Sequence, residues 1–113
     1  MTREELLPKK LLERIPPLNS NDGSQAAKII IHAKYFIAIF TWLVAECEVQ
    51  ADDVLFYGFV ENAADPQMSE WGYFTLKQLM EIKLHVGLGV ERDLYFKECT
   101  FSEYIKGENT ENA

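Results

Sequence analysis

The feature that most constrains the fold is a stretch of β-branched and aromatic residues over positions 28–49. Such side chains are typical of strands, because they pack well on a pleated surface. We therefore predict two antiparallel strands, 28–39 and 41–49, with a turn at 38–40, although no Gly or Asn marks that turn. One continuous apolar helix over 25–47 is the alternative, since a short apolar run does not settle its own period.

Three later segments carry the same strand signature. Residues 54–61 place apolar side chains on both faces, which predicts a central third strand. Residues 71–74 predict a short fourth strand, and residues 94–96 predict a fifth. Asp52 and Asp53 are predicted to form the turn before the third strand, and residues 63–70 a loop after it.

Three short helices are predicted from proline and capping signals. The segment LLPKKLLERIPPL, residues 6–18, suggests a first helix with Pro8 in its first turn and a proline pair at its end. Capping boxes open the other two helices at Thr75 with Gln78 and at Thr100 with Glu103. The sequence therefore predicts an α+β fold, with a mainly antiparallel sheet of about five strands and three short helices.

The length of 113 residues suits one domain, which we place at residues 6–106, followed by a disordered polar tail at 107–113. His32 and Lys34 interrupt the longest apolar run, so we expect no membrane-spanning segment. The first residues lack the apolar core of a secretion signal and the two cysteines form no CxxC pair. A cytoplasmic protein is the expectation.

The charge of the chain is acidic and unevenly distributed. Eleven basic residues against eighteen acidic ones give a formal net charge of -7, which disfavours direct binding to nucleic acid. A run without a single basic residue holds seven acidic ones: Glu46, Glu48, Asp52, Asp53, Glu61, Asp65 and Glu70. We expect a protein partner, for which a basic nucleic-acid-binding protein is the natural candidate.

Two polar clusters and one aromatic residue complete the candidate binding site. Glu46 and Glu48 would share one face of a strand, where a solvated surface is the favoured interpretation. Arg92 lies between Glu91 and Asp93 and is either a partner contact or part of a local ion pair. Trp71 beside an acidic neighbour is a candidate for an exposed recognition residue. With the seven acidic residues, Trp71 and Arg92 form the predicted partner-binding set.

Signals for catalysis, metals and cofactors are weak. His32, His85, Cys47 and Cys99 are of the right type for zinc, but they are scattered and lack paired ligand spacing. No nucleophile elbow and no phosphate-binding loop is present, and the segment from Gly87 to Gly89 is typical of a turn. We therefore predict no catalytic residue, no metal site and no cofactor.

Three blocks in order, LLPKKLLERIPPL, GYFTLKQLMEI and GLGVERDLYF, carry a resemblance that spans Leu6 to Tyr104. They resemble an uncharacterised family of small bacterial proteins, number 2958 in the domain-of-unknown-function series, whose members are often encoded on plasmids and other mobile elements. The resemblance implies a mobile-element setting and a small accessory or counter-defence protein. It implies no activity.

These observations support three hypotheses. The first is a non-enzymatic acidic protein-binding module, such as an inhibitor of a host nuclease or defence complex of the anti-CRISPR or anti-restriction type. The second is a small ligand-binding protein or enzyme that uses Glu46, Glu48, Arg92 and Tyr57 around a pocket in the sheet. The third is a homodimeric structural protein that pairs through an aromatic strand edge, and the oligomeric state, monomer or homodimer, stays open.

Overall fold

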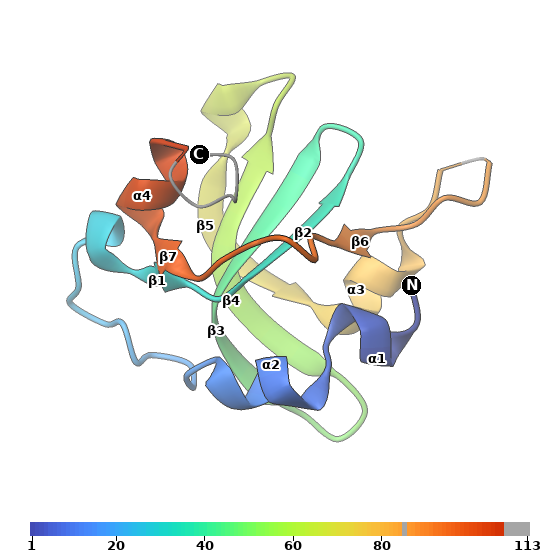
Figure 1. The fold of residues 1–113 in the computed structure, drawn as a ribbon, viewed down its shortest axis with the longest axis horizontal. Helices are drawn as coiled ribbons and strands as arrows, with labels where there is room; N and C mark the ends of the chain where they lie inside the picture. Colours follow the sequence, from blue (N-terminus) through green and yellow to red (C-terminus); the bar gives the residue numbers. More distant parts are fainter. Residues whose placement is uncertain (85, 108–113) are drawn as a thin grey trace.

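The computed structural model describes residues 1–84 and 86–107, and its centre is a five-stranded antiparallel sheet (Figure 1). The strand order is β5-β4-β3-β2-β6. The strands are β2 (Ala33–Ile37), β3 (Phe40–Val49), β4 (Val54–Asn62), β5 (Glu70–Thr75) and β6 (Glu91–Arg92). The α+β class and the mainly antiparallel sheet are confirmed.

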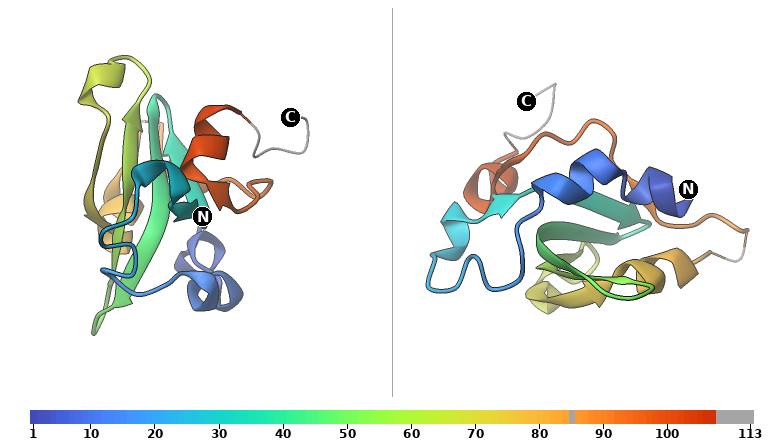
Figure 2. Two further views of the ribbon diagram at one scale, coloured as in Figure 1. Left: turned by 90° about the vertical axis from the view of Figure 1, so that its left-hand side faces the viewer. Right: turned by 90° about the horizontal axis from the view of Figure 1, so that it is seen from below.

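The first face of the sheet is covered by helices. Tyr35 and Phe56 are fully buried there against side chains of α1 (Arg3–Leu6), α2 (Lys9–Arg14) and α3 (Leu76–Glu81). The Tyr35 hydroxyl donates a hydrogen bond of 2.6 Å to the carbonyl oxygen of Leu6, which ties α1 to β2. Figure 2 shows α1 and α2 beside β2 and β3, with α3 on the β5 side.

The second face carries a smaller core made by segments far apart in sequence. Its buried members are Ile29, Ile31, Leu43 and Ala45. The covering elements are η1 (Ala26–Lys28), a two-stranded sheet of β1 (Ile30–Ile31) with β7 (Cys99–Thr100), and α4 (Phe101–Ile105). Figure 1 shows β1, β7 and α4 together at one side of the large sheet.

The predicted hairpin is confirmed over residues 33–49, and the single helix over 25–47 is wrong. The first strand begins later than predicted, because Lys28 belongs to η1 and Ile30–Ile31 pair with β7. Strands β2 and β3 pair from Ala33↔Val44 to Ile37↔Phe40, so that only two residues form the turn. Ala38 adopts a φ of 52° there, a conformation that usually selects Gly or Asn. The turn forms without either residue because the strands on both sides have buried side chains that fix their register.

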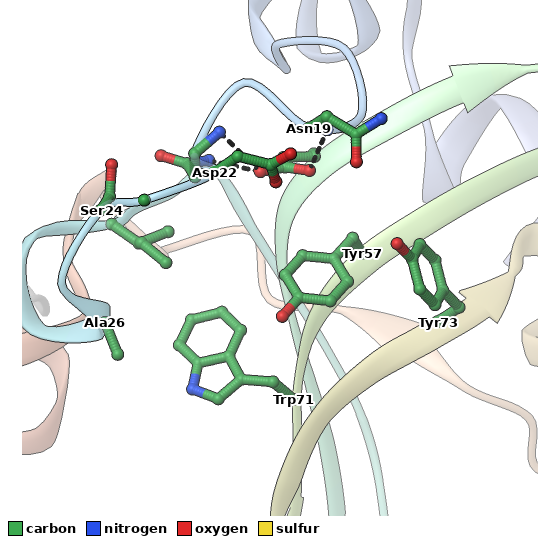
Figure 3. Close-up of a pocket in the computed structure, with 11 residues that line it drawn as sticks. Asn19, Asp22, Ser24, Ala26, Tyr57, Trp71 and Tyr73 are labelled. Carbon is green, nitrogen blue, oxygen red and sulfur yellow. Dashed lines mark hydrogen bonds between the residues drawn. The ribbon is translucent and has the colours of Figure 1, made fainter.

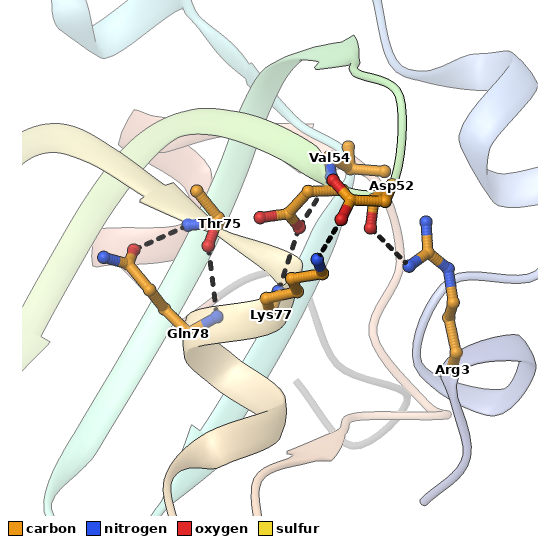
Figure 4. Close-up of polar contacts among 7 residues, drawn as sticks. Arg3, Asp52, Val54, Thr75, Lys77 and Gln78 are labelled. Atoms are coloured by element: carbon orange, nitrogen blue, oxygen red, sulfur yellow. Dashed lines mark hydrogen bonds and ion pairs between the residues drawn. The ribbon is translucent and has the colours of Figure 1, made fainter.

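Both predicted capping boxes are confirmed. Thr75 and Gln78 bond reciprocally at the start of α3, and Thr100 and Glu103 do so at the start of α4. The turn between β3 and β4 adds a further cap, because Asp53 Oδ1 accepts from the backbone N–H of Lys77 at 3.0 Å (Figure 4). The start of α3 is therefore held both by its own cap and by the turn before β4.

Two sequence predictions need correction. The fifth strand of the large sheet is β6 at residues 91–92, and not the predicted segment 94–96. Leu94 is exposed in the turn that follows β6. The first helix is split, because Pro8 is the N-cap of α2 and the chain before it forms α1. Proline fixes φ and has no N–H to donate, so the two helical segments do not join.

One prediction falls mostly outside the described residues. The tail predicted at 107–113 lies, from residue 108 on, outside the described residues. A second 3-10 turn, η2 (Pro66–Met68), fills the connection between β4 and β5. Within residues 1–84 and 86–107, no helix is both long and apolar enough to cross a membrane.

Candidate functional site

An open pocket of about 310 Å³ lies between the polar loop 19–26 and the second face of the sheet (Figure 3). The loop is the segment of Asn, Asp, Ser and Gly residues that connects the Pro16–Pro17 pair to η1. Strands β3, β4 and β5 supply the opposite wall. The residues of that wall are Glu46, Tyr57, Trp71 and Tyr73.

Strand register explains why these side chains meet. Glu46 on β3 is paired with Tyr57 on β4, which is paired with Tyr73 on β5. Directly paired residues point to the same face, so the three form a row across the sheet. Trp71 lies two residues before Tyr73 and shares that face.

The three aromatic rings form one continuous surface. Tyr57 stacks against Trp71 at an interplanar angle of 21° with centroids 5.9 Å apart, and the Tyr57 and Tyr73 centroids are 5.0 Å apart. Tyr73 keeps 60% of its surface exposed, while the other two rings are half-buried. The rings therefore present accessible faces to a ligand or partner.

Glu46 fixes the loop over the sheet. It is only 3% exposed, and its carboxylate accepts from the backbone N–H groups of Asn19 at 2.8 Å and Asn21 at 3.0 Å. The side-chain amide of Asn21 donates a third bond at 2.8 Å. Three donors compensate the burial of this carboxylate and hold it in place, so Glu46 orders the pocket rim.

A register shift in β3 allows this arrangement. The pairing of β3 with β4 slips between Val44 and Glu46, which leaves Ala45 as an extra residue in a bulge. Bulges redirect the side chains that follow them. Opposite the bulge, Gly58 approaches the Leu43 backbone so closely that a Cβ would lie 1.7 Å from the Leu43 carbonyl oxygen.

The pocket has a negative electrostatic character. Its described lining holds the carboxylates of Asp22 and Glu46, and among these lining residues there is no Lys, Arg or His. The pKa of Tyr57 is raised, mainly because the side chain is partly buried. The negative charge of Glu46 and the nearby Tyr73 and Asp22 raise this pKa further. The Tyr57 hydroxyl therefore remains a neutral donor, and the pocket favours cationic or neutral polar groups.

Three of the nine predicted partner-binding residues belong to this region. Glu46 and Trp71 line the pocket, and Glu48 lies two residues further along β3 with an exposed side chain. The solvated interpretation holds for Glu48. It is wrong for Glu46, because the loop covers that carboxylate and satisfies it with hydrogen bonds.

Asp52 and Asp53 lie in the β3–β4 turn, where both have structural partners. Asp52 forms an ion pair with Lys77, and its carbonyl oxygen accepts from the guanidinium of Arg3 at 3.3 Å. Asp53 caps its own strand at Val54 N–H and the start of α3 at Lys77 N–H. These two acids join the turn to α3 and α1 (Figure 4).

Glu61, Asp65 and Glu70 lie at the other end of the β4 hairpins. The pairing that ends at Val49↔Val54 begins at Phe40↔Asn62, so the length of β4 separates these acids from Asp52 and Asp53. Glu61 accepts a hydrogen bond of 2.9 Å from the Tyr104 hydroxyl. The pKa of Tyr104 is raised, first by the burial of its side chain and then by the negative charge of Glu61. Folding therefore does not gather the acidic run into one surface.

Arg92 lies on β6, at the opposite edge of the sheet from β5. Its Nε donates to the carbonyl oxygen of Glu5 at 2.9 Å, which joins β6 to α1. Arg92 therefore holds the edge strand in place, by a hydrogen bond to the backbone. The set of Glu46, Glu48, Arg92 and Tyr57 does not converge on one pocket.

The other candidate ligands also remain apart. Within the described residues there is no group of three or more His, Cys, Asp or Glu side chains placed to hold a metal ion. Cys47 and Cys99 are buried free thiols, and burial raises the pKa of each. His85 lies outside the described residues.

The predicted partner-binding set does not include Asn21, Asp22 or Tyr73. The first two stand in a segment that is plainly a loop, but no local pattern shows that it folds back onto Glu46. The available signal is indirect. An Asn- and Asp-rich loop before a strand with an internal Glu offers backbone donors to that carboxylate.

Comparisons with known proteins identify a family and no individual relative. The model of a family described as "Protein of unknown function (DUF2958)" matches residues 11–112. No curated protein and no solved structure matches the chain. The pocket geometry is therefore the main basis for a functional conclusion.

Proposed function

Because the chain belongs to the DUF2958 family of proteins of unknown function, we propose its role from the pocket: a non-enzymatic module that binds a basic protein partner. The observation that carries this proposal is the lining of the pocket. Aromatic faces and two carboxylates stand together there, and the described lining includes no cation. This combination suits an Arg or Lys side chain.

The energetics favour an Arg or Lys side chain in the pocket. A cation over a tyrosine or tryptophan face gains about 0.5–2 kcal/mol, depending on how far it is desolvated. Asp22 is exposed at the rim and can pair with the same cation, while the buried Glu46 adds its charge without giving up its own hydrogen bonds. The net charge of -7 steers basic partners toward the molecule.

The finer form of the proposal concerns the partner. In the mobile-element setting that the family resemblance implies, the module inhibits a host nuclease or defence complex of the anti-CRISPR or anti-restriction type. Proteins that bind nucleic acid carry exposed Arg and Lys side chains where phosphates dock. A module that occupies those side chains blocks access to nucleic acid without any chemical step.

The binding proposal is tested with an arginine-rich peptide titrated against the protein, with intrinsic tryptophan fluorescence and calorimetry as readouts. We expect binding that weakens steeply between about 0.05 M and about 0.5 M salt. Tyr73→Ala and Asp22→Asn should each weaken it by about fivefold or more. Absence of binding at the lower salt concentration contradicts the proposal.

Two matched variants serve as controls. Tyr95 is 70% exposed but follows β6 at the far edge, so Tyr95→Ala should leave binding unchanged. Asp65 is an exposed acid outside the pocket, so Asp65→Asn should also have no effect. Equal losses in the controls would mean that the peptide senses net charge and not this pocket.

The finer proposal needs the host partner. Affinity capture should compare the wild-type protein with the Asp22→Asn/Tyr73→Ala double variant, at low and at high salt. We expect a nucleic-acid-directed protein that the wild type recovers at low salt and the double variant does not. Recovery of no such protein by the wild type at either salt concentration would remove the inhibitor proposal.

A further inference from the structure

Strand β5 is an edge of the large sheet with an unusual lack of protection. Within the described part of the chain it pairs with β4 on one side and with no strand on the other. Proteins usually protect such edges with Lys, Pro, bulges or very short strands. The six residues EWGYFT contain neither Lys nor Pro, whereas the opposite edge strand β6 has only two residues.

The open edge and the pocket are adjacent. Trp71 and Tyr73 on β5 point into the pocket, while Phe74 points to the opposite face and is buried in the first core. Because side chains alternate along a strand, a further strand beside β5 would place every second side chain on the pocket face. One of those side chains would lie beside Tyr73.

We infer that the basic partner presents an extended segment that adds to β5 as a sixth strand and places one Arg or Lys in the pocket. This inference rests on the proposed function and specifies its binding mode. Backbone hydrogen bonds to β5 supply affinity that is independent of sequence, and the pocket supplies the preference for a cation. Charge complementarity identifies the occupant, since the described lining of the pocket is acidic and aromatic.

A second copy of this chain fits the same edge poorly. Pairing of two β5 strands would bring two copies of Glu70 and two acidic pockets into one interface, with no Lys or Arg from either β5. Each copy also carries a net charge of -7. Like charges brought together without partners oppose association.

The test uses a capped seven-residue peptide, Thr-Val-Thr-Arg-Thr-Val-Thr, and three derivatives. The first derivative replaces the Arg with Gln. The other two carry N-methyl groups on alternate backbone nitrogens, one on each edge of the extended peptide. N-methylation removes the donors of one edge and leaves the side chains unchanged.

Strand addition predicts an asymmetric result. One N-methylated peptide should bind like the parent, and the other should lose about tenfold or more in affinity, because only one peptide edge faces β5. The Gln peptide should bind about fivefold more weakly than the parent. Equal binding by both N-methylated peptides overturns the inference while leaving the proposed function intact.

The remaining outcomes are also decisive. Parent and Gln peptides that bind equally would refute the cation preference and with it the proposed function. Amide exchange gives an independent readout: the parent peptide should slow exchange within residues 70–75 and leave residues 91–92 unchanged. A protein that forms dimers at micromolar concentration, and loses peptide binding as it does so, would assign the edge to a second copy instead.

Discussion

Glu46 shows how one residue decides the shape of the candidate site. Its two carboxylate oxygens accept three bonds from the loop, and two of these come from the backbone N–H groups of Asn19 and Asn21. Asp22 and Ser24 of the same loop are exposed, by contrast. The loop conformation therefore depends on this one acceptor group.

We predict that Glu46→Gln lowers the free energy of unfolding by about 1–3 kcal/mol, because an amide N–H group must then face a backbone donor. Chemical denaturation measures the loss, and amide exchange should speed up at Asn19 and Asn21. Glu48→Gln is the matched control, since that side chain is exposed on the same strand. An unchanged stability in both variants would show that the loop does not depend on the carboxylate.

Gly58 carries the close approach of β4 to β3. A Cβ at this position would lie 1.7 Å from the backbone oxygen of Leu43, which cannot move away as a side chain could. We predict that Gly58→Ala destabilises the protein by about 3 kcal/mol or more, or prevents folding. Gly72 is its paired neighbour on β5, where an added Cβ would meet no heavy atom within 4 Å.

Gly72→Ala is therefore the control, with an expected change within about 1 kcal/mol by thermal or urea denaturation. Similar losses in the two variants would contradict the bulge geometry. The sequence alone does not distinguish these two glycines, because both stand among aromatic residues in strands. Only the pairing of distant strands separates them.

At the scale of the element, α4 should be sensitive to acid. The backbone N–H and the hydroxyl of Thr100 hold the pKa of Glu103 below its usual range. A carboxyl group with a lower pKa in the folded state stabilises the fold above its unfolded-state pKa, and this contribution is lost as the pH falls through the folded-state value. Glu103→Gln keeps an acceptor for Thr100 but does not titrate.

We expect the stability difference between the wild type and Glu103→Gln to be largest near neutral pH and to shrink from about pH 5 to about pH 3. Urea denaturation at several pH values measures it. A difference that stays constant over this range would mean that Glu103 gains nothing from its charge. The capping bond would then act through geometry alone.

Elements with local signals are predictable and elements without them are not. Each capping box lies within four residues of sequence, Thr75 with Gln78 and Thr100 with Glu103, so both can be predicted from the sequence. Strand β6 exists only because it pairs with β2, and β1 exists only because it pairs with β7. Two-residue strands carry no periodic pattern, which is why the sequence favours a fifth strand at 94–96 instead.

The candidate site is predictable only in part for the same reason. Glu46 and Trp71 can be selected because acidic and aromatic residues stand out in sequence. Their convergence with Asp22 and Tyr73 needs strand register and a loop that folds back from more than twenty residues away. The acidic run between Glu46 and Glu70 is dense in the sequence, by contrast, but folding spreads its carboxylates over separate parts of the surface.

At the scale of the whole molecule, a single sheet separates two cores and joins them. Leu43 and Val44 are adjacent on β3 and fully buried, each in a different core. The first core is closed by the N-terminal helices and α3, and the second by η1, the small sheet and α4. Neither face can lose its cover without exposing strands that the other face requires, so unfolding should be cooperative.

The two tryptophans of the chain test this cooperativity, because each reports on a different core. Trp42 is buried in the first core, and Trp71 packs against Phe101 of α4 with centroids 4.9 Å apart. In Trp71→Phe the fluorescence signal reports on the first core alone, and in Trp42→Phe it reports on the second.

We predict that within each variant the fluorescence and far-ultraviolet dichroism transitions in urea coincide. If Trp71 fluorescence changed at a lower urea concentration than the dichroism of the same variant, the second core would unfold by itself. The pocket, which shares Trp71 with that core, would then be formed by a separately unfolding layer, and its affinity for a cationic peptide would fall before the sheet melts.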